Sequence, residues 1–191
     1  MSLKSIVKVS HLSNLSDARY CAGMGVEMLG FCVIPGGVHF MPAKVFQDIR
    51  GWVSGPRIIA ELYGLSSAQE VTDIVNAYSP DFLELSLREY RAFGDSFTLP
   101  FLLYVTREEL GSIPADDRIA RIIVDEDTSC KDISAIRTPV LSQISSLQRL
   151  NEKVSEGCFQ GYVLQGPQEI RPGVTNYEQL GLILEALEEH D

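Results

Sequence analysis

The stretch FLLYVT at residues 101–106 is apolar at nearly every position, and IIV at residues 122–124 repeats this pattern about 20 residues later. A strand with one face in water alternates apolar and polar residues, whereas a strand covered on both faces is apolar throughout. Parallel strands with helical crossovers are covered in this way. The two runs therefore predict a parallel α/β sheet in the centre of the chain.

Runs of the same kind recur on either side of this centre. They predict strands at residues 6–10, 28–33, 57–61, 82–85, 101–106, 121–125, 139–143 and 161–164. Helical periodicity and capping residues predict helices at residues 14–22, 42–50, 67–78, 145–156 and 177–190. The segments 88–93, 107–113 and 129–136 are short and weakly patterned, so we expect single turns or irregular coil there.

Eight repeated strand–helix units favour a closed barrel over an open doubly wound sheet. No G-x-G-x-x-G motif follows the first predicted strand, which counts against a dinucleotide-binding sheet. We therefore predict a single (β/α)8 TIM-barrel domain over residues 1–191, just below the usual size of roughly 200 to 400 residues.

The chain is acidic, with 16 Lys and Arg against 26 Asp and Glu and a formal net charge of −10. Such a chain is poorly suited to nucleic acid or anionic membranes. It has no run of 18 apolar residues, and its N-terminus lacks the apolar core of a signal peptide, so we expect no membrane association. A small-molecule or protein partner is the remaining expectation.

Four cysteines, Cys21, Cys32, Cys130 and Cys158, are scattered without a C-x-x-C pair. This spacing predicts neither a disulfide framework nor a zinc knuckle. It favours a reducing, cytoplasmic location.

In a TIM barrel the active site lies where the strands end. Polar residues follow nearly every predicted strand, which predicts a small-molecule pocket, although a merely solvated rim would look similar. Among them His39, Glu84, Gln143, Gln165 and Gly166 are candidates for substrate binding, and Ser10, His11 and Asp125 lie at strand ends as well.

The opening KVSHLSNLSDA at residues 8–18 resembles that of phosphoribosylanthranilate isomerases, which reads K-I-C-G-I-T-N-x-x-D-A. The likeness continues in order along the chain. It includes LGF at 29–31 with Pro35, IIVD at 122–125, VLS at 140–142, and QGPQE at 165–169 followed by PG at 172–173.

The resemblance implies an Amadori rearrangement of an aminoaldose phosphate in tryptophan biosynthesis, part of aromatic amino acid biosynthesis, with no cofactor. In that family a cysteine at the end of the first strand is the general base, and an aspartate at the end of the sixth is the general acid. An arginine after the second strand holds the anthranilate carboxylate. Glycine-rich loops after the seventh and eighth strands hold the phosphate.

The catalytic positions carry over unevenly. Asp125 keeps the acid position, but Ser10 replaces the cysteine base, and an aliphatic hydroxyl is far too weak an acid to act as an alkoxide at neutral pH. His11 stands where the family has glycine and is a candidate substitute base if its side chain reaches the pocket. Adjacent strand residues point to opposite faces, so we do not expect Ser10 and His11 both to face inward unless the strand has ended.

The binding positions are less well kept. His39 replaces the arginine and cannot make a bidentate contact with a carboxylate. Gln143 and Ile144 replace two glycines, and Pro167 removes an N–H donor beside Gly166. Amides at 168–169 would bind an anion if a helix started there. No lysine or arginine lies in these two loops before Arg171, so we expect a disabled phosphate site.

Strand-end acids leave a second interpretation open. Glu61, Glu84 and Asp125, with Asp127, could converge on Mg²⁺ or Mn²⁺ together with His11 or His39, or could be spread around a wet rim and paired with arginines. No short ligand motif supports a metal, and we predict none.

Three hypotheses follow. The first is a divergent homologue of phosphoribosylanthranilate isomerase whose activity is lost or altered, because the base, the arginine and the phosphate glycines are replaced together. The second is an active isomerase that uses Asp125 as its acid. The third is a non-catalytic binding or scaffold protein, with a homodimer as one form.

Overall fold

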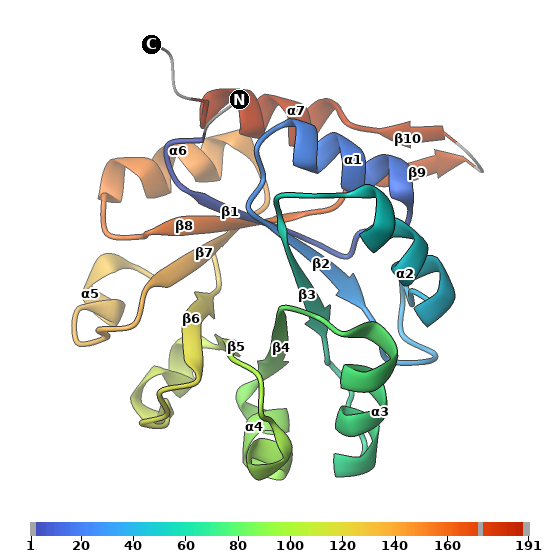
Figure 1. The fold of residues 1–191 in the computed structure, drawn as a ribbon. Coiled ribbons are helices and arrows are strands. Elements are labelled where there is room, and N and C mark those ends of the chain that lie inside the picture. The colour runs from blue at the N-terminus through green and yellow to red at the C-terminus, as the bar shows by residue number, and fades with distance from the viewer. Residues whose placement is uncertain (1–2, 172–173, 189–191) are drawn as a thin grey trace.

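The computed structural model describes residues 3–171 and 174–188 and contains a closed barrel of parallel strands (Figure 1). Each strand pairs with the next in the chain, and the last pairs with the first. The strands are β1 (Ile6–Ser10), β2 (Met28–Cys32), β3 (Arg57–Glu61), β4 (Phe82–Ser86), β5 (Phe101–Val105), β6 (Ile119–Val124), β7 (Val140–Ile144) and β8 (Gly161–Gln165). The predicted (β/α)8 barrel is confirmed, with strand bounds within two residues of those expected.

Helices surround the strands on the outside (Figure 1). They are α1 (Leu15–Gly23), α2 (Ala43–Trp52), α3 (Ala68–Tyr78), α4 (Leu87–Phe93), α5 (Cys130–Ile133), α6 (Leu147–Glu156) and α7 (Glu178–Ala186), with 3-10 turns η1 (Gly94–Ser96) and η2 (Arg107–Ser112). None of the described helices is long and apolar enough to cross a membrane. The predicted final helix extended to residue 190, which lies outside the described residues.

One local prediction was wrong, and one condition stated from the sequence is not met. The segment after β4 forms a regular helix, α4, because Ser86 and Glu89 make a reciprocal capping box at its start. The segment after Pro167 begins no helix but a strand, β9 (Gln168–Arg171), which pairs antiparallel with β10 (Val174–Asn176). The anion site that a helix at 168–169 would provide is therefore not formed.

The core has two parts, as alternation along a barrel strand requires. One part lies between the strands and the helices and includes Val7 and Val9 of β1. The other fills the barrel and consists of Met28, Ile59, Leu102, Ile123, Leu141 and Val163. Lys8 and Ser10 alternate with the valines and so face the barrel interior, towards its carboxyl end.

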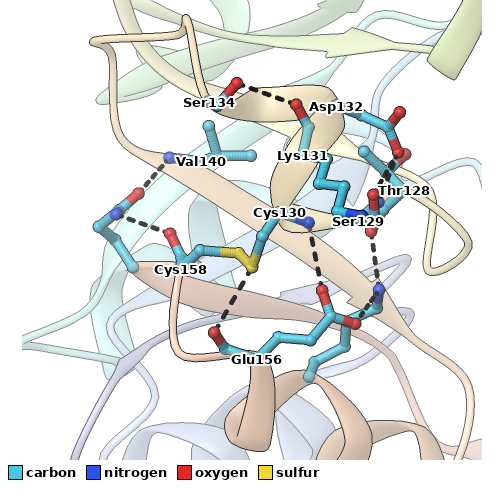
Figure 2. Close-up of a disulfide and its surroundings, with 11 residues drawn as sticks. Thr128, Ser129, Cys130, Lys131, Asp132, Ser134, Val140, Glu156 and Cys158 are labelled. Atoms are coloured by element: carbon cyan, nitrogen blue, oxygen red, sulfur yellow. Dashed lines mark hydrogen bonds and ion pairs between the residues drawn. A yellow bond between two sulfur atoms is a disulfide. The ribbon is translucent and has the colours of Figure 1, made fainter.

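The prediction that the cysteines form no disulfide was also wrong. Cys130 and Cys158, separated by 28 residues in sequence, are joined by a disulfide whose Cα atoms are 5.7 Å apart (Figure 2). The bond ties the start of α5 to the turn between α6 and β8. Cys21 and Cys32 are free and buried.

Candidate active site at the carboxyl end of the barrel

A buried ion cluster lies inside the barrel below its mouth. The side chain of Lys8 has no solvent exposure, and its Nζ lies 2.7 Å from Glu61 Oε1 and 2.7 Å from Glu84 Oε2. The same ammonium donates a hydrogen bond of 2.5 Å to Ser10 Oγ. Ser10 and Glu61 thus accept hydrogen bonds from the ammonium, and Glu84 contributes an ion pair.

Glycine at position 30 makes room for this cluster. A Cβ atom there would lie 2.2 Å from Glu61 Oε1 and 2.8 Å from Lys8 Nζ, too close for any side chain. Gly30 therefore leaves the space that the Lys8–Glu61 ion pair occupies.

The cluster keeps Lys8 charged. Burial by itself lowers the pKa of Lys8, but Glu61 and Glu84 outweigh it, and the pKa is raised above its ordinary value. Burial also raises the pKa of Glu84, while Lys8 lowers it and Glu61 raises it further. Tyr63 donates a 2.6 Å hydrogen bond to Glu84 Oε1, and burial raises the pKa of this phenol well above its usual range.

The contacts of Ser10 suit a hydrogen-bond donor and not a general base. Its side chain is buried at the end of β1, and its Oγ accepts a hydrogen bond from Lys8 Nζ. An ammonium has no lone pair, so Lys8 cannot take the hydroxyl proton of Ser10. The contact leaves Ser10 able to donate a hydrogen bond but not to act as a general base.

His11 lies beside Ser10 at the mouth, because β1 ends at Ser10 and alternation no longer applies. Its φ of 57° is in the left-handed region that favours glycine, the residue found here in the isomerases. The imidazole Nδ1 lies 2.7 Å from Gln165 Oε1, and Nε2 lies 3.6 Å from Glu61 Oε2. Ser10 and His11 both lie at the mouth because the strand has ended, which is the one case in which the sequence allowed this.

His39 also has a positive φ, of 65°, and its ring stacks on that of His11 with centroids 5.8 Å apart. The side chain comes from the exposed loop after β2. The structure thus brings His39, His11, Glu61 and Gln165 to one side of the barrel mouth.

Asp125 directly follows β6 and accepts a 2.5 Å hydrogen bond from Tyr104 of β5. Burial and this hydrogen bond raise the pKa of Tyr104. Asp125, Gln143 and Gln165 line a cavity of about 510 Å³, together with Arg107, Glu108, Glu126, Asp127, Thr128, Ile144 and Ser145. Gln165 also contacts His11, so it connects the acid candidate's cavity with the histidine side of the mouth.

A second cavity of about 420 Å³ shares Ile144, Ser145 and Gln165 with the first. It lies between the loops after β7 and β8 and helix α7. Its other lining residues are Leu164, Gly166, Pro167, Ile170, Asn176, Gln179, Leu180 and Ile183. Among these described lining residues there is no lysine or arginine to attract a phosphate.

Backbone amides in both of these loops already have acceptors. The N–H and Oγ of Ser145 donate to Glu126 Oε2 at 3.0 and 2.7 Å. The N–H of Gly166 donates to the carbonyl of Ser10 at 2.8 Å. A Cβ on Gly166 would lie 2.9 Å from that carbonyl, so close packing on β1 accounts for this glycine.

The alternative of a metal at the strand ends does not match this geometry. Lys8 Nζ lies between Glu61 and Glu84, where an ion bridging them would have to lie. These two acids are paired with a lysine from inside the barrel, and not with the arginines of a wet rim. Sequence reasoning missed Lys8 because a strand lysine is usually assigned to solvent; the signal was a charge inside the apolar run IVKV at 6–9.

No protein-family model matches the chain. Among curated proteins it is similar to N-(5'-phosphoribosyl)anthranilate isomerases. It is 24% identical to that of Xylella fastidiosa strain M12 over 96 residues, 50% of this chain and 44% of the relative. It is 25% identical to that of Xanthomonas oryzae pv. oryzae strain PXO99A over 117 residues, 61% of this chain and 52% of the relative. The match spans about half the length of these relatives.

Solved structures of the same kind share the fold over nearly the whole chain. The isomerase of Thermus thermophilus has a TM-score of 0.77 at 16% identity, covering 95% of this chain and 98% of that one. A second isomerase structure, a complex with reduced 1-(o-carboxyphenylamino)-1-deoxyribulose 5-phosphate, has a TM-score of 0.73 at 12% identity, with 95% and 97% covered. A third, of monomers made from the dimeric Thermotoga maritima enzyme, has a TM-score of 0.71 at 11% identity, with 95% and 97% covered. In sequence over half its length and in fold over nearly all of it, the chain is therefore similar to phosphoribosylanthranilate isomerases, as its opening motif predicts.

Proposed function

We propose that this chain is a phosphoribosylanthranilate isomerase-type barrel in which activity on the phosphorylated substrate has been lost or altered. In this proposal the ligand is a small molecule without a phosphate, bound where the strands end. The proposal rests on the hydrogen bonds of two backbone amides, one in the loop after β7 and one in the loop after β8. The N–H groups of Ser145 and Gly166 are engaged by acceptors of the chain itself, Glu126 and the Ser10 carbonyl.

Glu126 is an internal anion at the loop after β7. Its carboxylate accepts both hydrogen bonds of Ser145 and lies 3.8 Å from Arg149 Nε. A phosphate would have to displace this carboxylate or approach it as a like charge, and either step is unfavourable. The same arrangement supports binding of a neutral or cationic ligand.

The arginines near the first cavity are also paired with carboxylates of the chain. Arg149 pairs with Asp127 at 2.9 Å as well as with Glu126, and Arg107 pairs with Asp132 at 3.0 Å. Carboxylates therefore outnumber available positive charge at this side of the mouth. The overall charge of −10 acts in the same direction and also supports the absence of nucleic-acid binding.

One observation favours the alternative, an active divergent isomerase. Because β1 ends at Ser10, His11 lies at the mouth, and Asp125 lines the adjoining cavity. In that alternative His11 is the base and Asp125 the acid. It requires turnover that disappears in Asp125→Asn, with correct folding of the variant.

Growth and binding measurements separate these functions. We expect no growth without tryptophan when the chain is expressed in a strain lacking the isomerase; growth at normal expression would overturn the proposal. We also expect no binding of ribose 5-phosphate by titration calorimetry. Glu126→Ala frees the Ser145 donors and should permit phosphate binding, whereas Glu152→Ala, which removes another partner of Arg149, should not. Phosphate binding by the unmodified chain would contradict the proposed role of Glu126.

Two further properties stay proposals. A homodimer, as the Thermotoga maritima enzyme's description states for that protein, is tested by light scattering of the purified chain. A cytoplasmic location also stays a proposal; the Cys130–Cys158 disulfide counts against the cysteine-spacing argument for it, and fractionating cells that express the protein tests it.

A further inference from the structure

We propose that Cys130, Cys158 and Glu156 form a binding site for a zinc-type divalent cation when the disulfide between the two cysteines is reduced. The disulfide and the metal complex are then two alternative states of the same three side chains. This site lies beside α6, none of its three ligands lines either cavity described above, and it does not depend on the proposed function.

The three ligand groups already lie together. Both Sγ atoms and one carboxylate oxygen of Glu156 are within 4.8 Å of one another, the one such group of three among the described residues (Figure 2). Two thiolates and a carboxylate suit Zn²⁺, which binds sulfur and oxygen in tetrahedral sites. A water molecule would supply the fourth ligand.

Glu156 is held against the sulfurs by contacts on both of its oxygens. The N–H of Cys130 donates to Oε2 at 3.3 Å, and Lys153 Nζ lies 2.9 Å from Oε1. Lys153 is itself fixed by a 2.7 Å hydrogen bond to the Thr128 carbonyl. The carboxylate is therefore positioned before any ion arrives.

Opening the disulfide requires little movement. Two sulfurs bound to one zinc at about 2.3 Å each are about 3.8 Å apart in tetrahedral geometry. The Cα atoms of Cys130 and Cys158 are 5.7 Å apart, so rotation of the side chains can provide this separation. Both cysteines are half-buried, which leaves solvent access for an ion.

The charges of the reduced site match a divalent cation. Two thiolates and Glu156 carry three negative charges, and the ammonium of Lys153 offsets one of them. A Zn²⁺ ion neutralises the remaining two. Without the ion, two thiolates and a carboxylate in contact would repel one another, so metal binding and loss of the thiol protons are coupled.

A dithiol reductant supplies the electrons and protons that open the disulfide. Two electrons and two protons from the dithiol convert the Cys130–Cys158 bond to two thiols, and the dithiol becomes a disulfide. The metal ion then displaces the two thiol protons. Either state tethers the segment after β6 to α6, next to the contacts of Asp127 with Arg149 and of Thr128 with Lys153.

Cobalt and zinc titrations test the proposal. The full chain is reduced with dithiothreitol, freed of reductant under anaerobic conditions and titrated with Co²⁺. We expect thiolate-to-cobalt charge-transfer absorption at one equivalent, and its displacement by Zn²⁺. The oxidised chain should show neither.

Substitutions of the proposed ligands test which side chains bind the metal ion. Cys130→Ser should abolish the charge-transfer band. Glu156→Gln should weaken zinc binding by about tenfold or more, the size of loss that follows even when a residue supporting a ligand is removed. Glu152→Gln, one turn earlier on α6, should bind as the unmodified chain does, and circular dichroism checks that each variant is folded. Absence of the band in the reduced chain, or an unchanged band in Cys130→Ser, would overturn the proposal.

Discussion

Replacing Gly30 by alanine tests the buried cluster directly. The new Cβ would lie 2.2 Å from Glu61 Oε1 and 2.8 Å from Lys8 Nζ, distances at which neighbouring atoms must move. Glu61 is 1% exposed and Lys8 fully buried, so neither can reach water instead. The substitution therefore separates an ammonium from one of its two carboxylates inside the barrel.

The expected cost follows from the geometry. Breaking a buried ion pair costs about 3 to 5 kcal/mol. Because Lys8 keeps its 2.7 Å contact with Glu84, we expect the lower end, about 3 kcal/mol. With a urea m-value of about 2 to 3 kcal/mol/M, the midpoint of unfolding should fall by about 1 to 1.5 M.

Urea denaturation followed by circular dichroism is the assay. Gly51→Ala is the matched control, since position 51 lies in α2 with nothing within 4 Å of its Cβ. Alanine there should be neutral or stabilising by about 0.5 to 1 kcal/mol. Adding Glu61→Ala to Gly30→Ala removes the clashing oxygen, so the pair should be less than additive. A loss below about 1 kcal/mol for Gly30→Ala, at unchanged m-value, would refute the described cluster.

Three further predictions use other parts of the structure. His11→Gly should raise the free energy of unfolding by about 1 kcal/mol, because glycine adopts the φ of 57° without strain; a loss of stability in urea would contradict this. Replacing Cys130 and Cys158 by serine should lower the free energy of unfolding by about 3 to 4 kcal/mol, because the unfolded chain regains the entropy that closing a loop of 28 residues removes. An unchanged calorimetric melting temperature would count against the disulfide. Hydrogen bonds from Arg118 hold the pKa of Asp116 well below its ordinary value. The Asp116 carboxylate therefore stabilises the fold fully above its unfolded pKa of about 4, and this stability is lost as the pH falls through the lower folded pKa. Asp116→Asn should flatten the curve of unfolding free energy against pH below about pH 4, and a curve of unchanged slope would refute this prediction.

The barrel could be predicted because burial on both strand faces leaves a continuous apolar run, as in FLLYVT at 101–106. Helix starts were readable where a side chain caps the backbone, as Asn14 does for Asp17 at 2.9 Å. The same chemistry was present but overlooked at α4, where Ser86 and Glu89 have capping-box spacing.

The rest depends on contacts between distant segments. Nothing at position 8 indicates that Glu61, 53 residues later, will neutralise a lysine inside the barrel. The disulfide likewise requires that α5 and the end of α6 meet, which the spacing of Cys130 and Cys158 does not reveal. The candidate site positions Asp125, Gln143 and Gln165 were found together because strands in a barrel end at one face. Their roles stay predictions.

We propose that the chain does not process the phosphorylated substrate of its relatives. The most direct test is the loss of phosphoribosylanthranilate fluorescence in the presence of the purified, folded chain. We expect a rate equal to that of buffer, both for the unmodified chain and for Asp125→Asn. A faster rate for the unmodified chain that disappears in Asp125→Asn would contradict it.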